Sequence, residues 1–391
     1  MRMTSRVCVT VGAGSTLLAA LLAALLAAPV SLAAAQGSLS MQGFGYPIGG
    51  QSARSQGSGS ALAGIDPQTP LNPASIVLNG RLQAYGQYEP EFRTVTIGGN
   101  STKTTTSRFP LFMVTGHQNK ATVALSFSSL MDRTWINTYA DTQSLGSERI
   151  ASTVLTQSVG GIADARLAVA WTFTEYFHVG GAVHLYPGDN KVSVGRIFSD
   201  SVHAGNFDVT NAYTFAGSAL SLGAVYVVAK AHLILSGDLR LGGQLAMRLG
   251  DSTKVGEGKI PFRAGMSASY DGIAGSVFSV RIGTERWSDL RGLGSSSLGL
   301  KDAVDMAIGT EIAGPRISNT PVLFRAGYRT RGLPFTYGAT AVTESSIGGG
   351  IGVPFIGGRT ILDVGASRAT RNVPGISEKS WLVSVGIGIR P

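Results

Sequence analysis

Residues 381–389, close to the end of the chain, alternate between two kinds of side chain. In an extended strand, Trp381, Val383, Val385, Ile387 and Ile389 share one face, and the other face carries only a leucine, a serine and two glycines. A strand that is apolar on one face and small or polar on the other fits a sheet with lipid outside and a wet interior. The pattern therefore favours a β-barrel that spans a membrane.

The same alternation recurs along much of the chain. Clear or candidate segments are 76–88, 109–116, 121–127, 165–173, 177–185, 207–215, 220–228, 233–241, 262–270, 278–284, 306–312, 322–328, 345–353 and 360–366. With the last strand they number about 15, and single-chain bacterial barrels have an even number of strands. We therefore predict an all-β fold, a transmembrane antiparallel β-barrel of about 14 strands.

Alternation alone also fits a soluble β-sandwich or propeller, in which the apolar face meets a second sheet. Two details favour lipid. Trp171, Phe173, Tyr176 and Phe177 flank the short turn 174–175, where an aromatic girdle would meet the membrane surface. Polar, Gly-rich stretches at 98–107 and 288–302 predict long loops, and long loops at one end with short turns at the other are typical of membrane barrels.

Composition agrees with strands that expose only alternate residues to lipid. Charged residues make up 14% of the chain, against about 25% in an ordinary soluble domain. After Ala35 no run approaches the roughly 18 apolar residues that indicate a membrane helix. Together these observations disfavour both a soluble globular protein and a helical membrane protein.

The N-terminus has the three parts of a secretory signal peptide. Arg2 and Arg6 precede an apolar run over 17–28, and small residues at 33–35 supply a cleavage site. A retained membrane anchor is the alternative, although the purely apolar core is shorter than the ~20 residues of a spanning helix. Cleavage would remove Cys8, the only cysteine, so the mature chain would have no disulfide and no thiol site.

The net charge of +9 has two interpretations. Nucleic acid is disfavoured as a partner because Lys and Arg are scattered without a dense run. Contact with an anionic membrane surface, or a lumen lined by cations, accounts for the same charge.

The segment between the signal and the first strand narrows the family. It is rich in small residues and ends in Asn72, Pro73 and Ala74. This arrangement resembles the start of the FadL/OmpP1/TodX outer-membrane barrels, including their PorV-like relatives. The corresponding residues are Ala53, Arg54, Gly57, Gly59, Ala61, Ala63, Asp66, Asn72, Pro73 and Ala74. The chain departs from the family at its end, because Arg390 and Pro391 stand where an aromatic residue is common.

The resemblance implies a bacterial outer-membrane protein in three parts. These are a signal peptide over 1–35, a periplasmic or lumenal N-terminal hatch over 36–75, and the barrel over 76–391. It implies passive uptake of hydrophobic small molecules, such as long-chain fatty acids or aromatic hydrocarbons, with Gly57, Gly59, Asp66 and residues 72–74 in the hatch. PorV-like relatives instead bind partner proteins for secretion or surface attachment, and that alternative stays open. A general porin is disfavoured because the hatch would fill its lumen.

Six arginines fall on strand faces that would point into the lumen. They are Arg81, Arg166, Arg240, Arg263, Arg281 and Arg325. A lumen arginine could pair with the carboxylate headgroup of a solute. The alternative is that these arginines pair with acidic residues of the interior, namely Asp164, Asp238, Glu285 and Glu311.

No motif predicts an enzyme, a metal site or a cofactor. His178 and His184 lie on one side of a strand, but at about 20 Å apart they are too distant to share a metal. Gly258 and Lys259 lack the earlier Gly and the following Ser or Thr of a phosphate-binding loop. We therefore expect a non-enzymatic membrane protein without a cofactor.

Overall fold

Alternating outward and inward side chains build the wall of the protein in the computed structural model. It describes Leu39 and residues 45–80, 82–145, 148–199, 206–250, 253–293, 300–317, 320–355 and 358–390. These residues belong to one compact unit, Ala33–Pro391. The signal peptide predicted over 1–35 lies outside the described residues, as does Arg81. Within the described ranges, no helix is both long and apolar enough to cross a membrane.

Antiparallel pairing joins 18 strands into one sheet. They are β1 (Tyr46–Pro47), β2 (Gln83–Ile97), β3 (Asn100–Gln118), β4 (Ala121–Asp132), β5 (Trp135–Leu145), β6 (Glu148–Thr174), β7 (Phe177–Leu185), β8 (Gly188–Phe198), β9 (Phe207–Val228), β10 (Leu233–Leu249), β11 (Thr253–Lys259), β12 (Arg263–Ile273), β13 (Ser276–Glu285), β14 (Ala303–Ile317), β15 (Thr320–Tyr337), β16 (Thr340–Phe355), β17 (Thr360–Val373) and β18 (Ile376–Ile389). Short helices are α3 (Ala53–Gly57), η1 (Ala61–Gly64), η2 (Pro73–Asn79), η3 (Ala229–Ala231) and η4 (Trp287–Leu293).

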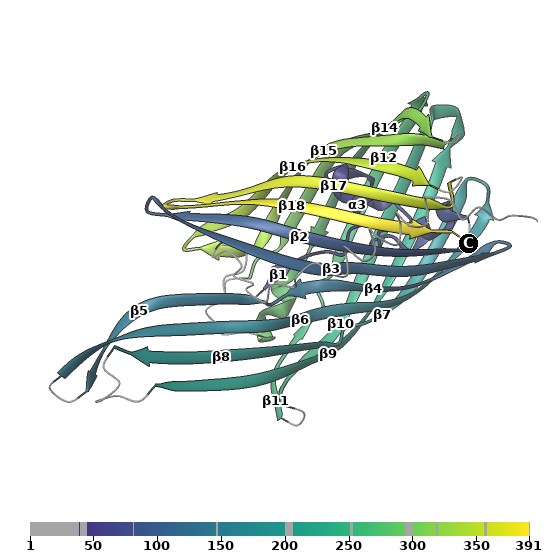
Figure 1. The fold of residues 1–391 in the computed structure, drawn as a ribbon. Helices are drawn as coiled ribbons and strands as arrows, with labels where there is room; N and C mark the ends of the chain where they lie inside the picture. The colour runs from purple at the N-terminus through teal and green to yellow at the C-terminus, as the bar shows by residue number, and fades with distance from the viewer. Residues whose placement is uncertain are drawn as a thin grey trace, which may run out of the picture. The chain divides into compact units, whose positions relative to one another are not determined.

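The sheet closes on itself as a barrel of 14 strands, since β18 pairs with β2 and β9 pairs with β10 (Figure 1). Three further strands, β5, β8 and β11, extend β4, β7 and β12, from which they are separated by two or three residues that are not in a strand. The remaining strand, β1, pairs with β4 but comes from the segment before the barrel. The predicted fold class and strand number are confirmed.

The two ends of the barrel differ. We call the end where β2 begins and β18 ends the terminal end, and the opposite one the distal end. Turns at 119–120 and 175–176 lie at the terminal end, whereas the long connection 286–302, which includes η4, lies at the distal end. The prediction of a long loop over 98–107 is wrong. Gly98 and Gly99 make a tight turn and β3 begins at Asn100, because the run of threonines that follows suits a strand.

The exposure of apolar and polar side chains is the reverse of that in a soluble protein. Leu125, Phe127 and Leu167 point outward and are 60%, 52% and 51% exposed, whereas their inward neighbours Ser126 and Arg166 are buried. Exposed apolar residues recur around the outside of the barrel, and buried charged residues recur inside it. This distribution fits lipid outside the wall and disfavours the sandwich alternative, in which the apolar faces would be covered.

Residues 73–79, part of which was expected to open the first strand, instead form η2. Asn72 caps this helix by accepting a hydrogen bond from the Ala74 backbone N–H at 2.9 Å, and Pro73 occupies the first turn. Gly80 ends the helix with φ of 60°, a left-handed conformation that glycine adopts without steric cost. The chain therefore joins the wall only at Gln83.

Candidate functional site

Residues 45–79, here called the N-terminal segment, pack against inward-facing residues of the barrel. Helix α3 contacts β15–β18, η1 contacts β12–β15, and η2 contacts β4, β6, β7 and β9. The side chains of α3, η1 and η2 are mostly buried by these contacts. The candidate site is therefore built from this segment and the wall around it.

A row of glycines on β14, β15 and β16 lies against Ser58, the residue that follows α3. Gly309 pairs with Gly327, and Gly327 pairs with Gly348. A Cβ on Gly327 would lie 2.0 Å from the Ser58 carbonyl oxygen, and one on Gly309 would lie 2.2 Å from the same atom. Only glycine lets the two backbones approach this closely.

The predicted hatch glycines meet the same row. Gly59 has φ of +62°, and a Cβ there would lie 2.7 Å from the backbone carbonyl carbon of Gly327. A Cβ on Gly57 would lie 3.1 Å from the Cα of Gly350. In this structure both glycines provide close contact with the wall, so a movable hatch stays a prediction.

Asp66 organises the N-terminal segment from within. Its fully buried carboxylate accepts hydrogen bonds from Ser55 Oγ at 3.0 Å, from Thr69 Oγ1 at 2.7 Å, and from the backbone N–H of Gln68 at 3.2 Å. Ser52, which caps α3, also donates to it. Hydrogen bonds to a charged acceptor contribute about 1.5–3 kcal/mol each, so this carboxylate holds the ends of the segment together.

The triplet Asn72, Pro73 and Ala74 fixes the segment to the opposite wall. The Asn72 side-chain amide donates to the carbonyl of Gly64 at 3.0 Å and to the carbonyl of Ala224 on β9 at 3.2 Å. A Cβ on Gly223 would lie 2.0 Å from Asn72 Oδ1. The triplet thus caps a helix and anchors it to the barrel.

Four of the predicted lumen arginines pair with acids of the wall. Arg240 bonds Glu285 at 3.2 Å, and both Arg263 and Arg281 bond Asp238, at 3.2 and 3.1 Å. Arg325 bonds Glu311 at 2.6 Å and Asp363 at 2.5 Å. The alternative of mutually satisfied interior charges therefore describes these four.

Arg166 differs from the others. Its side chain is 1% exposed, and its three guanidinium nitrogens have no hydrogen-bond partner among the described residues. Ser126, its paired neighbour on β4, likewise has an unsatisfied buried hydroxyl. Nearby Asp164 is bonded to His184 at 2.8 Å instead. A buried guanidinium without partners is costly, which singles out Arg166 as a group able to accept an anionic partner.

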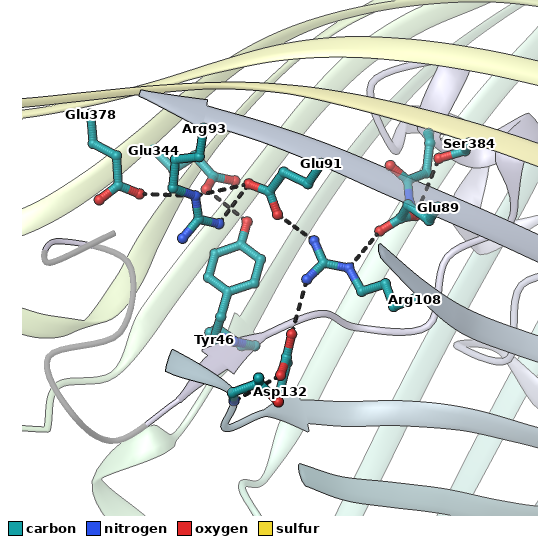
Figure 2. Close-up of polar contacts among 12 residues, drawn as sticks. Tyr46, Glu89, Glu91, Arg93, Arg108, Asp132, Glu344, Glu378 and Ser384 are labelled. Atoms are coloured by element: carbon teal, nitrogen blue, oxygen red, sulfur yellow. Dashed lines mark hydrogen bonds and ion pairs between the residues drawn. The ribbon is translucent and has the colours of Figure 1, made fainter. Parts of the chain in front are cut away.

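A second charged cluster surrounds Tyr46, which enters the distal half of the lumen on β1. Its hydroxyl donates to Glu344 Oε2 at 2.9 Å (Figure 2). The same hydroxyl accepts a hydrogen bond from Arg371 Nη2 at 3.0 Å. Four guanidinium groups lie 5.1–5.9 Å from the centre of its ring. These belong to Arg93, Arg108, Arg331 and Arg371. The ring and hydroxyl together hold the start of the segment in place.

The wall is incomplete beside this cluster. Strand β3 pairs with β4 only between Leu111 and Gln118, while its distal part, Asn100–Pro110, pairs only with β2 in the described residues. Strand β5 pairs only with β6 there. The strand is interrupted between Asp132, where β4 ends, and Trp135, where β5 begins. At this interruption β1 pairs with the end of β4. The result is a gap, here called the wall gap, between distal β3 and β4/β5.

A cavity of about 540 Å³ occupies the wall gap. Its lining includes Phe127 on the outward face of β4 and the buried residues Met131 and Ile162. Arg108 of β3 crosses it, bonding Asp132 of β4 at 3.2 Å and Glu89 at 3.1 Å (Figure 2). The lining of the gap therefore includes both outward-facing and buried apolar side chains.

The two histidines have separate protein partners. His178 bonds Thr172 at 3.1 Å, whereas His184 bonds Asp164 at 2.8 Å and Ser221 at 2.7 Å. Asp164, His184 and Ser221 are bonded in the order of a hydrolase triad. Each is at most 7% exposed, however, so this series of hydrogen bonds satisfies buried polar groups. In the described ranges no cluster of three or more His, Cys, Asp or Glu is arranged to hold a metal ion.

Sequence reasoning missed the Tyr46 cluster and the wall gap. The alternating Glu89, Glu91 and Arg93 on β2 were a visible signal, since three charges on one face of a membrane strand must point inward. Tyr46 itself carried no signal, because its partners on β16 and β17 are about 300 residues away along the chain: 298 to Glu344 and 325 to Arg371.

Comparison with known proteins gives relatives in structure alone. No protein-family model and no curated protein sequence matches the chain. Among solved structures, a Pseudomonas aeruginosa FadL homologue superposes with a TM-score of 0.62 at 11% identity, covering 88% of this chain and 99% of that one. The Ralstonia pickettii toluene transporter TbuX gives 0.56 at 14% identity, with 88% and 99% covered.

The Pseudomonas putida toluene transporter TodX gives a TM-score of 0.54 at 12% identity, covering 88% of this chain and 98% of that one. Each match spans nearly the whole of the solved structure. At these identities the likeness establishes the fold and leaves the solute open. The chain has the fold of the FadL/TodX-type β-barrels.

Proposed function

We propose that the chain is a bacterial outer-membrane channel for passive uptake of hydrophobic small molecules. The wall gap carries this proposal, because a cavity of about 540 Å³ there is lined both by the outward-facing Phe127 and by the buried Met131 and Ile162. An apolar solute that reaches it from the distal end would leave sideways into the bilayer, where its transfer free energy is favourable. A signal peptide over 1–35 and a hatch over 36–75 belong to the same proposal.

The buried charges inside the barrel support a lateral route over a straight one. The N-terminal segment packs against the inner face of the wall, with residues such as Asp66 and Arg325 almost wholly buried. An apolar solute moving along the axis would have to cross this charged packing, at the cost of breaking buried ion pairs. The solved relatives are a FadL homologue and two toluene transporters, which is consistent with hydrophobic solutes here as well.

Arg166 supports a carboxylate-bearing solute within this class. It is the lumen arginine whose donors lack hydrogen-bond partners among the described residues, and it lies on β6 beside the segment. A long-chain fatty acid would offer the missing anion, whereas an aromatic hydrocarbon would not. The remaining predicted arginines would keep the interior rigid.

The alternative is a PorV-like barrel that binds partner proteins. It is favoured by the sheet that β5, β6, β8 and β9 extend beyond their neighbours (Figure 1), because β5 presents an edge unpaired by any described strand. Uptake assays separate the two functions. Cells expressing the chain should take up a labelled long-chain fatty acid or a small aromatic hydrocarbon faster than cells without it, and equal rates would favour the scaffold.

A further inference from the structure

A groove of about 620 Å³ lies on the outer face of β15–β18, away from the lumen and the wall gap. Register places Tyr328, Ile347, Arg368 and Trp381 side by side across four neighbouring strands. In the next row toward the terminal end, the paired residues of β16 and β17 are glycine and alanine, which leave room between the larger side chains. The groove is thus long, mostly apolar and open toward the surroundings of the barrel.

Arg368 is the charged residue of this groove. It points outward and is exposed, and its guanidinium carbon lies 5.7 Å from the centre of the Trp381 ring. The described residues give its guanidinium no hydrogen bond or salt bridge. An arginine on the outer face of a membrane barrel places its stem against apolar surface and its head at the polar boundary.

The position of Arg368 matches the edge of the apolar band. On β18 the outward residues from Ile389 to Trp381 are all apolar, and the next outward residue is Lys379. That apolar run covers roughly 26 Å of strand at ~3.3 Å per residue, or about 20 Å of height at a typical strand tilt. Arg368 pairs with Trp381 and therefore lies where the apolar band meets the distal headgroup layer.

Further positive charge stands beside the groove. Lys379 is paired with Thr370, which puts it diagonally next to Arg368, at about 7–8 Å between Cα atoms. The nearest acids on these two strands, Asp363 and Glu378, alternate to the inner face and are 2% and 0% exposed. The outer surface here is therefore cationic, with no acid of the described β16–β18 outer rows to neutralise it.

We propose that this groove binds a phosphate-bearing lipid of the distal leaflet. Arg368 and Lys379 hold the phosphate, which needs two or more donors at the headgroup level. An acyl chain lies over Gly349 and Ala366, against the side chain of Ile347. The proposal goes beyond solute uptake and requires only that the barrel spans a membrane.

Native mass spectrometry of the full barrel in detergent tests this proposal, with bisphosphorylated lipid A, phosphatidylglycerol and neutral diacylglycerol as probes. The double variant Arg368→Gln/Lys379→Gln should bind the two phosphorylated lipids about tenfold more weakly than the native chain. Lys191→Gln, which removes an exposed cation of β8, is the matched control and should bind as the native chain does. A double variant that binds like the control would overturn the proposal, as would equal binding of diacylglycerol.

A second variant tests the groove without changing any charge. A Cβ on Gly349 would meet its nearest atom at 3.8 Å, so Gly349→Leu fits the fold and fills the groove. It should weaken lipid binding at least fivefold, and unchanged binding would contradict a bound acyl chain. The electrophoretic shift of the folded barrel on heating verifies that each variant has assembled. Solute uptake by the Arg368→Gln/Lys379→Gln cells should stay normal, which separates this proposal from the transport function.

Discussion

Arg108 Nη1 lies 3.2 Å from Asp132 Oδ2 and joins β3 to β4 at the level where their backbones are not paired. Glu89 and Glu91 hold the other side of the same guanidinium. The two edges of the wall gap are therefore linked through side chains. Side chains can change rotamer without breaking the sheet, so in the proposed lateral route this ion pair would control the opening.

Removing the Asp132 charge should widen the gap. Asp132→Asn keeps the hydrogen bond from the Thr134 backbone N–H but weakens the link to Arg108, a loss of about 1.5 kcal/mol for a hydrogen bond between charged groups. We expect the initial rate of hydrophobic solute uptake to rise several-fold in cells. Asp141→Asn, whose partner Arg196 lies in the extended sheet, is the control. An unchanged rate in Asp132→Asn would argue against control at this pair.

The glycine row should tolerate no added side chain. Gly327→Ala places a Cβ against the Ser58 carbonyl, so the segment must shift, at a cost of about 1–3 kcal/mol for overpacking. The thermal unfolding midpoint of the barrel should fall. Gly116→Ala on β3, where a Cβ would meet nothing within 4 Å, should leave it unchanged. Equal midpoints for the two variants would show that the contact with Ser58 is not tight.

Asp66 should control how firmly the N-terminal segment is held. Asp66→Ala removes the acceptor for Ser52, Ser55 and Thr69, so the segment should open more often and expose the peptide bond after Arg54 to trypsin. We expect cleavage there at least tenfold faster than in the native barrel, measured by mass spectrometry of the fragments. Asp208→Ala, at an exposed position of β9, supplies the comparison. Cleavage at the native rate would mean that the wall contacts alone hold the segment.

Arg166 should be dispensable for folding but not for a carboxylate solute. Arg166→Met removes a buried charge that has no hydrogen-bond partner among the described residues, which is neutral or stabilising. Arg240→Met instead leaves Glu285 without its partner and destabilises the barrel. Fatty-acid uptake should fall about tenfold in Arg166→Met, while uptake of an aromatic hydrocarbon should stay constant. If both solutes were affected equally, Arg166 would have no role as an anion partner.

The wall was predictable because strand alternation is local. The face of β18 that carries Trp381 and Ile389 is read directly from the sequence, and the structure places it outside. Two of the strand breaks also had a local signal, since Pro187 and Pro261 each interrupt a strand and proline cannot donate to a ladder. The break at Arg133 and Thr134, which opens the wall gap, has no proline and was not predictable in this way.

For the interior, the sequence predicted which side chains face inward but not which of them pair. The sequence places Arg166 and Arg240 on inward faces, but which of them finds an acid depends on neighbours on other strands, such as Glu285 on β13. The N-terminal segment shows the same limit. Asn72 and Pro73 predict a helix cap from local sequence. Their contact with β9 depends instead on glycines more than 100 residues away, as the separation of 152 between Asn72 and Ala224 indicates.

Blocking the wall gap tests the transport account most directly. Ser129 lines the cavity there, and Ser129→Trp would fill it, whereas Thr153→Trp adds the same side chain to an exposed position of β6. Uptake of a labelled long-chain fatty acid and of a small aromatic hydrocarbon is measured in cells with equal amounts of assembled barrel. The account predicts at least tenfold slower uptake for Ser129→Trp and a native rate for Thr153→Trp. Native rates for both variants would contradict a lateral route through this gap.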